Sequence, residues 1–206
     1  MQGRSPLDHQ LTPSLCQVFQ QSGFKAKIRA VGRFDSQFSA ITVLRLLAWL
    51  ETDRQYRDIV LDMEDHDQER RENQPHTWNI QKQIIVDFIQ NLAAKCAANS
   101  QPVLSEYSEE YIRKVTGILM TNTTSLQLRE AGLGVGLYPL YAMGNHSCLP
   151  NTRTVVRPDR VLELVALTTV RAGEEVTSGY ITAQAGTVER RKTLWENWFF
   201  HCSCSR

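Results

Sequence analysis

The hydrophobic pattern divides the chain into a helical first part and a second part of short strands. From Ser39, apolar residues recur at the three- and four-residue spacing of an amphipathic helix of about three turns. A second and longer helix is predicted from Ile80 to Cys96, and a third after Ser108, whose hydroxyl can cap it. The first 120 residues are therefore expected to be largely helical.

Two segments of this first part lack such periodicity. Residues 1–38 mix Pro, Gly, Ser and Gln with isolated apolar residues, which is typical of a linker or the end of another domain. The polar run from Asp62 to Asn73 is interpreted as a solvated helix face followed by a loop.

The second part carries the pattern of strands. Thr152–Val156 and Val161–Leu167 are rich in β-branched and apolar residues and are separated by Arg-Pro-Asp-Arg, which predicts a hairpin. A further short strand is expected over Glu175–Tyr180, and Thr187 can cap a helix that runs to Trp198. Helices followed by short strands indicate an α+β fold.

Composition narrows the class of protein. The chain has 206 residues, 42% of them hydrophobic, which suits one compact domain or a domain with a small appendage. Its formal charge of +1 does not provide the basic surface of a dedicated nucleic-acid binder. No apolar run approaches the roughly 18 residues of a membrane span, and the first thirty residues do not resemble a signal peptide. We therefore expect an intracellular protein.

The cysteines are the first candidate for chemistry. Five is an odd number, which in a reducing compartment favours metal binding, catalysis or burial over disulfides. Cys202-x-Cys204 can place two thiolates on one ion, although a lone pair is a weak signal and two cysteines in a flexible tail are the alternative. Cys148, in a polar loop, can add a third sulfur. The chain then stops with three sulfurs for such a site and no fourth ligand.

The loop Gly144–Asn151 (GNHSCLPN) is the second candidate, because so polar a cluster is costly to bury without a partner. One interpretation is a Cys148–His146 nucleophile pair, as in a thiol hydrolase. Against it, residues i and i+2 rarely point at each other, and no orienting third residue stands out. Asn145-His146-Ser147 also matches the glycosylation pattern, but without an export signal that match is formal.

Three motifs follow one another in the second part of the chain: Asn145-His146-Ser147-Cys148-x-Pro150-Asn151, then Ala172-Gly173-Glu174-Glu175 followed by Tyr180, then Cys202-x-Cys204. In this order they resemble the C-terminal half of a SET domain, and more narrowly the SMYD family, in which a MYND zinc finger splits the SET domain. The resemblance implies a helical insert of the SET-I kind over 39–121, a SET core of small strands over 122–196 and the start of a cysteine-rich post-SET segment over 197–206. Residues 1–38 would be the linker or remnant after a MYND finger.

The resemblance also implies an activity and a cofactor. SMYD enzymes transfer a methyl group from S-adenosylmethionine to a protein lysine. Asn145 and His146 would hold the adenosyl part of the cofactor, and Asn122 would lie beside its polar end. Phe200 would form part of the cofactor or channel wall.

Tyr180 would be the catalytic residue and would also contact the cofactor, its hydroxyl helping to orient the reacting methyl group. A desolvated channel lined by aromatics favours the neutral amine, since a free lysine has a pKa near 10.4. Trp198 occupies the channel position where many relatives have a second tyrosine, which puts the number of methyl groups added, or activity itself, in question.

By the same resemblance, Cys148, Cys202 and Cys204 match three of four zinc ligands, and the fourth would be the residue after Arg206. The zinc site is thus expected to be incomplete in this chain, and the chain to be an inactive fragment of a longer enzyme. The partner would be a histone or non-histone protein bearing a lysine, with no sequence-specific nucleic acid and no membrane. A monomer in the cytoplasm and nucleus is expected.

Departures of this sequence from the SMYD pattern leave a second function open. A glycine-rich N-terminal SET segment and a recognisable MYND finger are absent from these residues. A catalytically silent, zinc-binding SET-like module that binds protein partners in transcriptional regulation is therefore the alternative. A purely structural zinc protein is a third.

Overall fold

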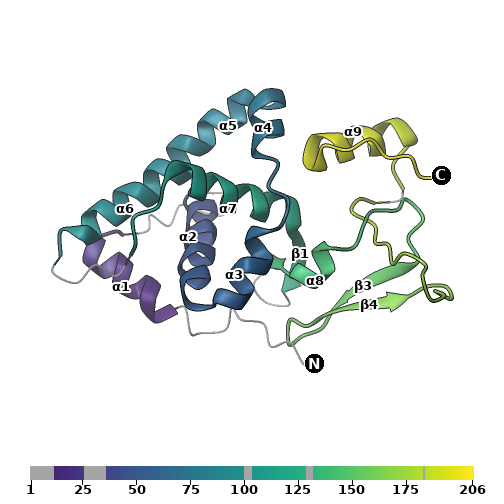
Figure 1. The fold of residues 1–206 in the computed structure, drawn as a ribbon, viewed down its shortest axis with the longest axis horizontal. Helices are drawn as coiled ribbons and strands as arrows, with labels where there is room; N and C mark the ends of the chain where they lie inside the picture. The colour runs from purple at the N-terminus through teal and green to yellow at the C-terminus, as the bar shows by residue number, and fades with distance from the viewer. Residues whose placement is uncertain (1–11, 26–35, 100–103, 129–131, 183) are drawn as a thin grey trace. The chain divides into compact units, whose positions relative to one another are not determined.

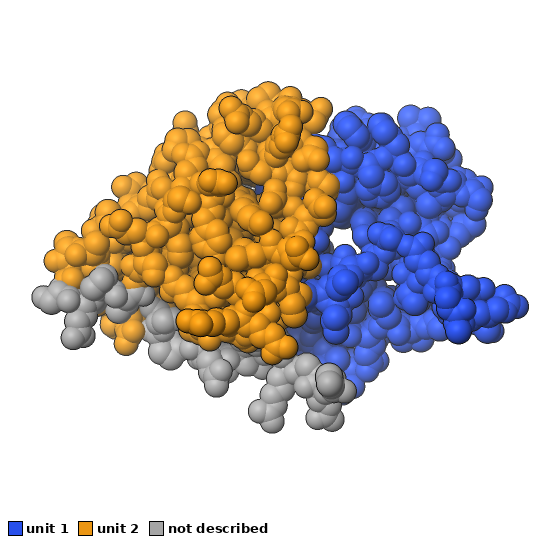
Figure 2. Space-filling view, viewed as in Figure 1, with its two compact units in different colours: residues 1–5, 120–206 blue, residues 6–119 orange. Residues whose placement is uncertain are grey.

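The computed structural model describes residues 12–25, 36–99, 104–128, 132–182 and 184–206 (Figure 1). The chain divides into two compact units, one formed by Pro6–Leu119 and the other containing Met120–Arg206 (Figure 2). The first unit is helical, and the second combines small antiparallel sheets with helices. This is the mixed helical and small-sheet architecture that the sequence pattern predicts. No helix in the described ranges has both the length and the apolar character needed to cross a membrane.

The helical unit is built around apolar faces that recur at helical spacing. Its elements are α1 (Thr12–Ser22), α2 (Ser36–Thr52), α3 (Arg54–Leu61), α4 (Asp67–Asn73), α5 (Pro75–Gln81), the π-helical turn η1 (Lys82–Val86), α6 (Asp87–Ala97) and α7 (Glu109–Asn122), whose last turn passes into the second unit. Leu44, Leu47 and Leu50 of α2 are completely or almost completely buried, as are Ile89 of α6 and Ile112 of α7. These side chains form the core of the unit.

Local signals set several of the helix boundaries. The Asp53 carboxylate accepts the Tyr56 N–H at 2.9 Å and caps α3. Ser108 caps α7 in the same way, its hydroxyl accepting the Tyr111 N–H at 3.1 Å, which confirms the sequence prediction. Pro75 begins α5 at a position where its missing N–H costs nothing.

The second unit contains the described strands. β1 (Thr123–Leu128) pairs antiparallel with β2 (Gly132–Leu137), and β3 (Thr152–Val156) with β4 (Leu162–Ala166). The short helix α8 (Pro139–Ala142) lies between the two pairs in sequence, and α9 (Thr187–Trp198) follows them. The β3–β4 pair confirms the predicted hairpin. Arg157, at the end of its turn, forms ion pairs with Asp159 and Glu163.

Three segments of the helical unit differ from the sequence prediction, and a fourth agrees with it. The pattern does not predict α1, in which Leu15 and Val18 are buried and which packs against α6. The predicted helix from Ile80 to Cys96 instead spans α5, η1 and α6, because five residues adopt π-helical geometry. The polar run has its loop first and its helix second, and Arg70 of that helix is buried. The α7 prediction is confirmed.

Two predictions in the second unit need correction. Glu175–Tyr180 is not a strand, since only Ser178 pairs, through a single parallel bridge with His146. Side chains, and not a neighbouring strand, accept hydrogen bonds from the backbone near Ser178. The Thr177 N–H donates to the Asn151 amide oxygen, and the Tyr180 N–H donates to the His146 ring. The final helix has the predicted extent, but Gly186 is its N-cap residue and no side chain caps it.

Candidate metal centre and aromatic site

Two motif segments far apart in sequence lie side by side in the second unit. The Ser147 N–H donates to the Ser178 carbonyl at 2.9 Å, and the Ser178 N–H donates to the Asn145 carbonyl at 3.0 Å. Asn151 adds side-chain bonds: its amide oxygen accepts the Thr177 N–H at 2.8 Å. Its amide nitrogen donates to the Glu175 carbonyl at 2.7 Å. The loop after α8 and the segment before Tyr180 therefore form one hydrogen-bonded layer.

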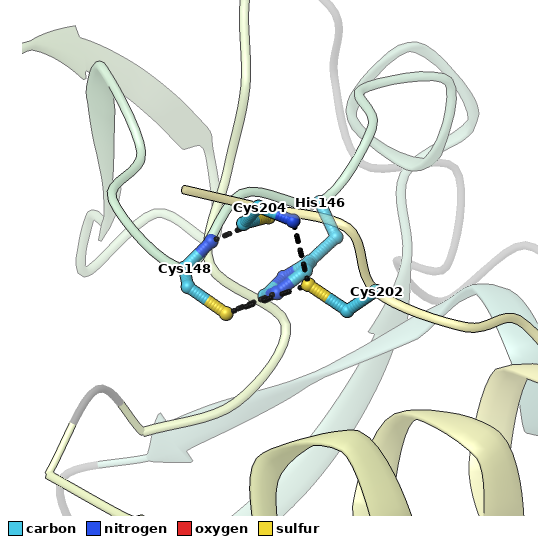
Figure 3. Close-up of side chains that lie close together, drawn as sticks. All are labelled: His146, Cys148, Cys202 and Cys204. Carbon is cyan, nitrogen blue, oxygen red and sulfur yellow. Dashed lines mark hydrogen bonds between the residues drawn. The ribbon is translucent and has the colours of Figure 1, made fainter. Parts of the chain in front are cut away.

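Three cysteine sulfurs and one imidazole converge beside this layer. We call His146, Cys148, Cys202 and Cys204 the metal-site cluster, since one ligand atom of each lies within 4.8 Å of the others (Figure 3). The Cys148 and Cys202 sulfurs are 3.7 Å apart, and the His146 Nε2 is 3.3 Å from the Cys148 sulfur. Cys148 and Cys202 are buried. The structure thus brings together all three cysteines that the sequence predicts as ligands.

The segment after α9 is held to the loop by hydrogen bonds that end on sulfur. The Cys148 N–H donates to the Cys204 sulfur at 3.3 Å, and the Cys204 N–H donates to the Cys202 sulfur at 3.4 Å. Burial raises the pKa of the Cys202 thiol to about 11. Burial acts in the same direction on Cys204, but the Cys148 N–H and neighbouring side chains outweigh it, so the pKa of that thiol is lowered. Backbone donors aimed at sulfur are the environment that stabilises a thiolate.

The donor set of the metal-site cluster fits zinc. Zinc prefers thiolate and imidazole ligands in a tetrahedron, with Zn–S bonds of about 2.3 Å, which puts two ligating sulfurs about 3.8 Å apart. The Cys148–Cys202 separation of 3.7 Å matches that geometry. No carboxylate belongs to the group in the part of the chain that the structure describes, which disfavours calcium and magnesium.

An aromatic cluster adjoins the metal-site cluster and consists of the rings of His146, Tyr180, Trp198 and Phe200. The Tyr180 ring centroid lies 5.1 Å from that of Trp198, 5.3 Å from that of His146 and 6.4 Å from that of Phe200. Tyr180, Trp198 and Phe200 pack on the buried residues Cys148, Leu194 and Cys202, so the two clusters share one small core.

Tyr180 is held at both its backbone and its hydroxyl. The hydroxyl donates to the Gly144 carbonyl at 2.8 Å, and the backbone N–H donates to the His146 Nδ1 at 3.1 Å. Burial, reinforced by Tyr141, raises the pKa of Tyr180, so the phenol stays neutral at physiological pH. Because its proton is directed at Gly144, the oxygen lone pairs remain available to accept a hydrogen bond or to face a positive charge.

The other predicted site residues are distributed around this core. The Trp198 indole N–H donates to the Thr121 carbonyl at 2.9 Å, which ties α9 to the residue before Asn122. Asn145 is exposed, and its side-chain amide donates to Glu175 at 2.5 Å. The Asn145 side chain is therefore directed at the 174–175 segment and not at the aromatic cluster.

Two features of the site escape sequence reasoning. The expectation that His146 and Cys148 would not face each other is wrong, because the loop is irregular and both side chains turn toward Cys202 (Figure 3). The sequence also assigns no role to the Gly144 carbonyl or to the Asn151 side chain, which hold Tyr180 and its segment. No local signal reveals such contacts, since each joins residues more than twenty positions apart.

Comparison with known proteins agrees with the motif order. A sequence profile of the SET domain matches residues 42–181. The histone-lysine N-methyltransferase SMYD3 of Mus musculus is 42% identical over 74 residues, which are 36% of this chain and 17% of the relative. The histone-lysine N-methyltransferase Smyd1 of the same species is 31% identical over 117 residues, 50% of this chain and 24% of the relative.

A plant relative matches a similar stretch. The histone-lysine N-methyltransferase ASHR1 of Arabidopsis thaliana is 37% identical over 73 residues, which are 35% of this chain. The matched segments span between 15% and 24% of the length of these three relatives.

Proposed function

The chain belongs to the SET domain family and is of the SMYD type within it, and on that basis we propose that it is part of a protein-lysine N-methyltransferase. The substrate would be a lysine side chain of a histone or another protein, as the names of the relatives suggest. We further propose that the whole protein acts as a monomer in the cytoplasm and nucleus.

The observation that carries the proposal is the environment of Tyr180. A neutral phenol is tied to the Gly144 carbonyl inside an aromatic cluster, with its lone pairs free. Transfer of a methyl group to lysine requires an amine that has lost its proton, and aromatic walls disfavour the charged ammonium by desolvation. An oriented hydroxyl oxygen and aromatic faces also stabilise a positively charged group beside them.

The same surroundings fit S-adenosylmethionine, which when bound supplies an electrophilic methyl group carried on a cationic sulfur. We propose that Tyr180 and Phe200 contact it, that Asn145 and the backbone of His146 hold its adenosyl part and that Asn122 lies near its polar end. The His146 ring nitrogens are both occupied, by Tyr180 N–H and by the Cys148 sulfur. Any contact of His146 with the cofactor is therefore assigned to its backbone or its ring face.

Zinc completes the proposal as a structural ion. Cys148, Cys202 and Cys204 would bind it, which would hold residues 197–206 against the SET core as a post-SET segment. The fourth ligand is proposed to be a residue following Arg206 in a longer chain. The helices between residues 39 and 121 would then be the SET-I-like insert.

One observation favours a second function, a catalytically silent binding module. Trp198 stands where a channel tyrosine is expected, and its only polar hydrogen is already bound to the Thr121 carbonyl. It therefore offers the substrate amine an aromatic wall but no hydroxyl.

Substitution of Tyr180 by Phe separates these functions. We expect Tyr180→Phe to lower radiolabelled methyl transfer to lysate proteins at least about a hundred-fold while cofactor binding, measured by calorimetry, persists. Each variant is compared with the unsubstituted protein in the longer, complete chain of which residues 1–206 are proposed to be part. Tyr138→Phe is the matched control, because the Tyr138 hydroxyl also donates to a backbone carbonyl, that of Arg160, but lies outside the aromatic cluster.

The outcomes are distinct. Unchanged transfer by Tyr180→Phe would contradict the catalytic role of this residue. Cofactor binding without transfer by any form would favour the silent module, and metal binding without cofactor binding would favour a structural zinc protein.

A further inference from the structure

The chemistry of the His146 ring is determined by its neighbour Tyr180. A backbone N–H can only donate, and that of Tyr180 points at the His146 Nδ1 at 3.1 Å. Nδ1 must therefore present a lone pair. A neutral imidazole with a bare Nδ1 carries its hydrogen on Nε2, and Nε2 lies 3.3 Å from the Cys148 sulfur.

We propose that His146 is a neutral, Nε2-protonated imidazole that donates a hydrogen bond to the metal-bound Cys148 sulfur and so couples the metal centre to the backbone of Tyr180. The proposal rests on the metal-binding part of the proposed function. His146 is a positioning residue in this arrangement, since it acts on Tyr180 and Cys148 and on no reacting atom.

This tautomer excludes His146 as the fourth metal ligand. A histidine that ligates through Nε2 keeps its hydrogen on Nδ1. Here that hydrogen would face the Tyr180 N–H and leave two partly buried donors pointing at each other. His146 therefore stands in the second layer around the metal, although its nitrogen lies as close to the sulfurs as a ligand would.

The tautomer also removes the thiol-hydrolase alternative. A general base must accept the thiol proton at the nitrogen that faces it. In His146 that nitrogen already carries a hydrogen, and the other lone pair is bound to Tyr180 N–H. Cys148 is in addition buried against the sulfur of Cys202, where a substrate carbonyl has no access to it.

The two hydrogen bonds of the His146 ring link the metal-site cluster to the backbone of Tyr180. Cys148, Cys202 and Cys204 would hold a bound metal as thiolates, and a thiolate at Cys148 would be the stronger acceptor for Nε2–H. The His146 ring would then be held more firmly, and with it the Tyr180 N–H. An occupied metal centre would in this way restrain the backbone of Tyr180, the tyrosine whose hydroxyl is bound to the Gly144 carbonyl.

Nuclear magnetic resonance of the zinc-loaded chain tests the tautomer directly. The chain is labelled with nitrogen-15 at histidine, and the His146 signals are identified by their loss in His146→Phe. We expect the hydrogen on Nε2 and a bare, hydrogen-bonded Nδ1. A hydrogen on Nδ1 together with a metal-bound Nε2 would overturn the proposal, and so would a chain that binds no metal. The position of the hydrogen is measured on the unsubstituted chain, and the variant serves only to identify the His146 signals.

Titration with cobalt(II) tests how much the His146 hydrogen bond contributes to metal affinity. Loss of an outer-layer hydrogen bond weakens metal affinity about 10–100-fold, so His146→Phe should bind cobalt less tightly by that factor with its sulfur-to-metal charge-transfer bands unchanged. His201→Phe is the control, because His201 precedes a ligand in sequence but stacks on Trp195 at 4.5 Å. Altered ligand-field bands in His146→Phe would instead mark His146 as a ligand and refute the proposal.

Hydrogen exchange at the Tyr180 amide tests the coupling. Zinc should slow this exchange in the unsubstituted chain. In His146→Asn the amide oxygen can still accept the Tyr180 N–H, but no ring reaches the sulfur, so the effect of zinc should disappear. An equal zinc effect in both proteins would refute the coupling. Methyl transfer is not among these readouts, so a chain that passes them and transfers no methyl group contradicts only the enzymatic proposal.

Discussion

At the scale of single residues, the site depends on side chains that bond to the backbone of another segment. Asn151 holds Thr177 and Glu175, His146 holds Tyr180, and the Gly144 carbonyl receives the Tyr180 hydroxyl. These bonds replace the ladder that a strand at residues 175–180 would have made. A single substitution can therefore release a whole segment.

Asn151→Ala is expected to destabilise the layer between the two motif segments. The substitution removes the bonds to the Thr177 N–H and the Glu175 carbonyl, each worth about 1 kcal/mol net. We expect the local free energy of opening, measured by denaturant-dependent hydrogen exchange at the Ser147 and Ser178 amides, to fall by about 2 kcal/mol. Asn197→Ala is the control, because that exposed side-chain amide donates to the Thr193 carbonyl of its own helix, α9, as the Asn151 amide does to a carbonyl of another segment. An equal fall in the free energy of opening in the two variants would refute the role of Asn151 in holding the two motif segments together.

At the scale of elements, packing overrides intrinsic preference at several points. α7 carries a glycine in its interior, Gly117, where alanine is normally the better helix former. A side chain there has no room, since an added Cβ would lie 2.3 Å from the Asp65 carbonyl oxygen and 2.9 Å from the Asp65 Cβ. The glycine thus permits the segment before α4 to pass close to α7.

Gly117→Ala should therefore destabilise the helical unit in spite of its gain in helix propensity. Backbone atoms of Asp65 cannot rotate away, and overpacking of this kind costs about 1–3 kcal/mol. The measurement is the free energy of urea unfolding of the helical unit, followed by exchange of its amides. Gly186→Ala, where no atom lies within 4 Å of the added carbon, should change stability by at most about 1 kcal/mol. A more stable Gly117→Ala would show that α7 and Asp65 do not approach closely.

At the scale of the whole molecule, the two units differ in what stabilises them. The helical unit has a core of aliphatic side chains such as Leu44, Leu47 and Ile89. The unit containing residues 120–206 has small two-stranded sheets, and the metal-site cluster belongs to its compact sulfur-and-aromatic core. Two-stranded sheets are marginal by themselves, which leaves this unit more dependent on a metal.

Removal of metal should therefore affect one unit only. Treatment of the zinc-loaded chain with a chelator should accelerate amide exchange at least about tenfold around residues 145–150 and 199–206 and leave residues 40–97 unchanged. Cys202→Ser should lose this response, whereas Cys96→Ser, outside the cluster, should retain it. Uniform acceleration in both units, or none, would contradict this prediction.

Much of the local architecture could be predicted from the sequence. The bounds of α9, the β3–β4 hairpin and the Ser108 cap of α7 each depend on residues within a few positions of one another. The pairing of β1 with β2 escaped prediction, because glycine-rich β2 has little strand propensity of its own. The Tyr138 ring and the Leu126 side chain occupy the space that a side chain at Gly136 would take.

The sequence by itself determined the α+β class, the order of three SET-type motifs and the three cysteines that converge on one point. Residue identity and spacing carry that information, since chemistry requires particular atoms in a particular order. Only the tertiary structure decided that side chains hold the 175–180 segment. It also decided that the Trp198 indole N–H donates to the Thr121 carbonyl and that the His146 ring bridges Tyr180 and Cys148. Each of these bonds joins distant parts of the chain or depends on the irregular path of a loop, and neither property is encoded in local periodicity.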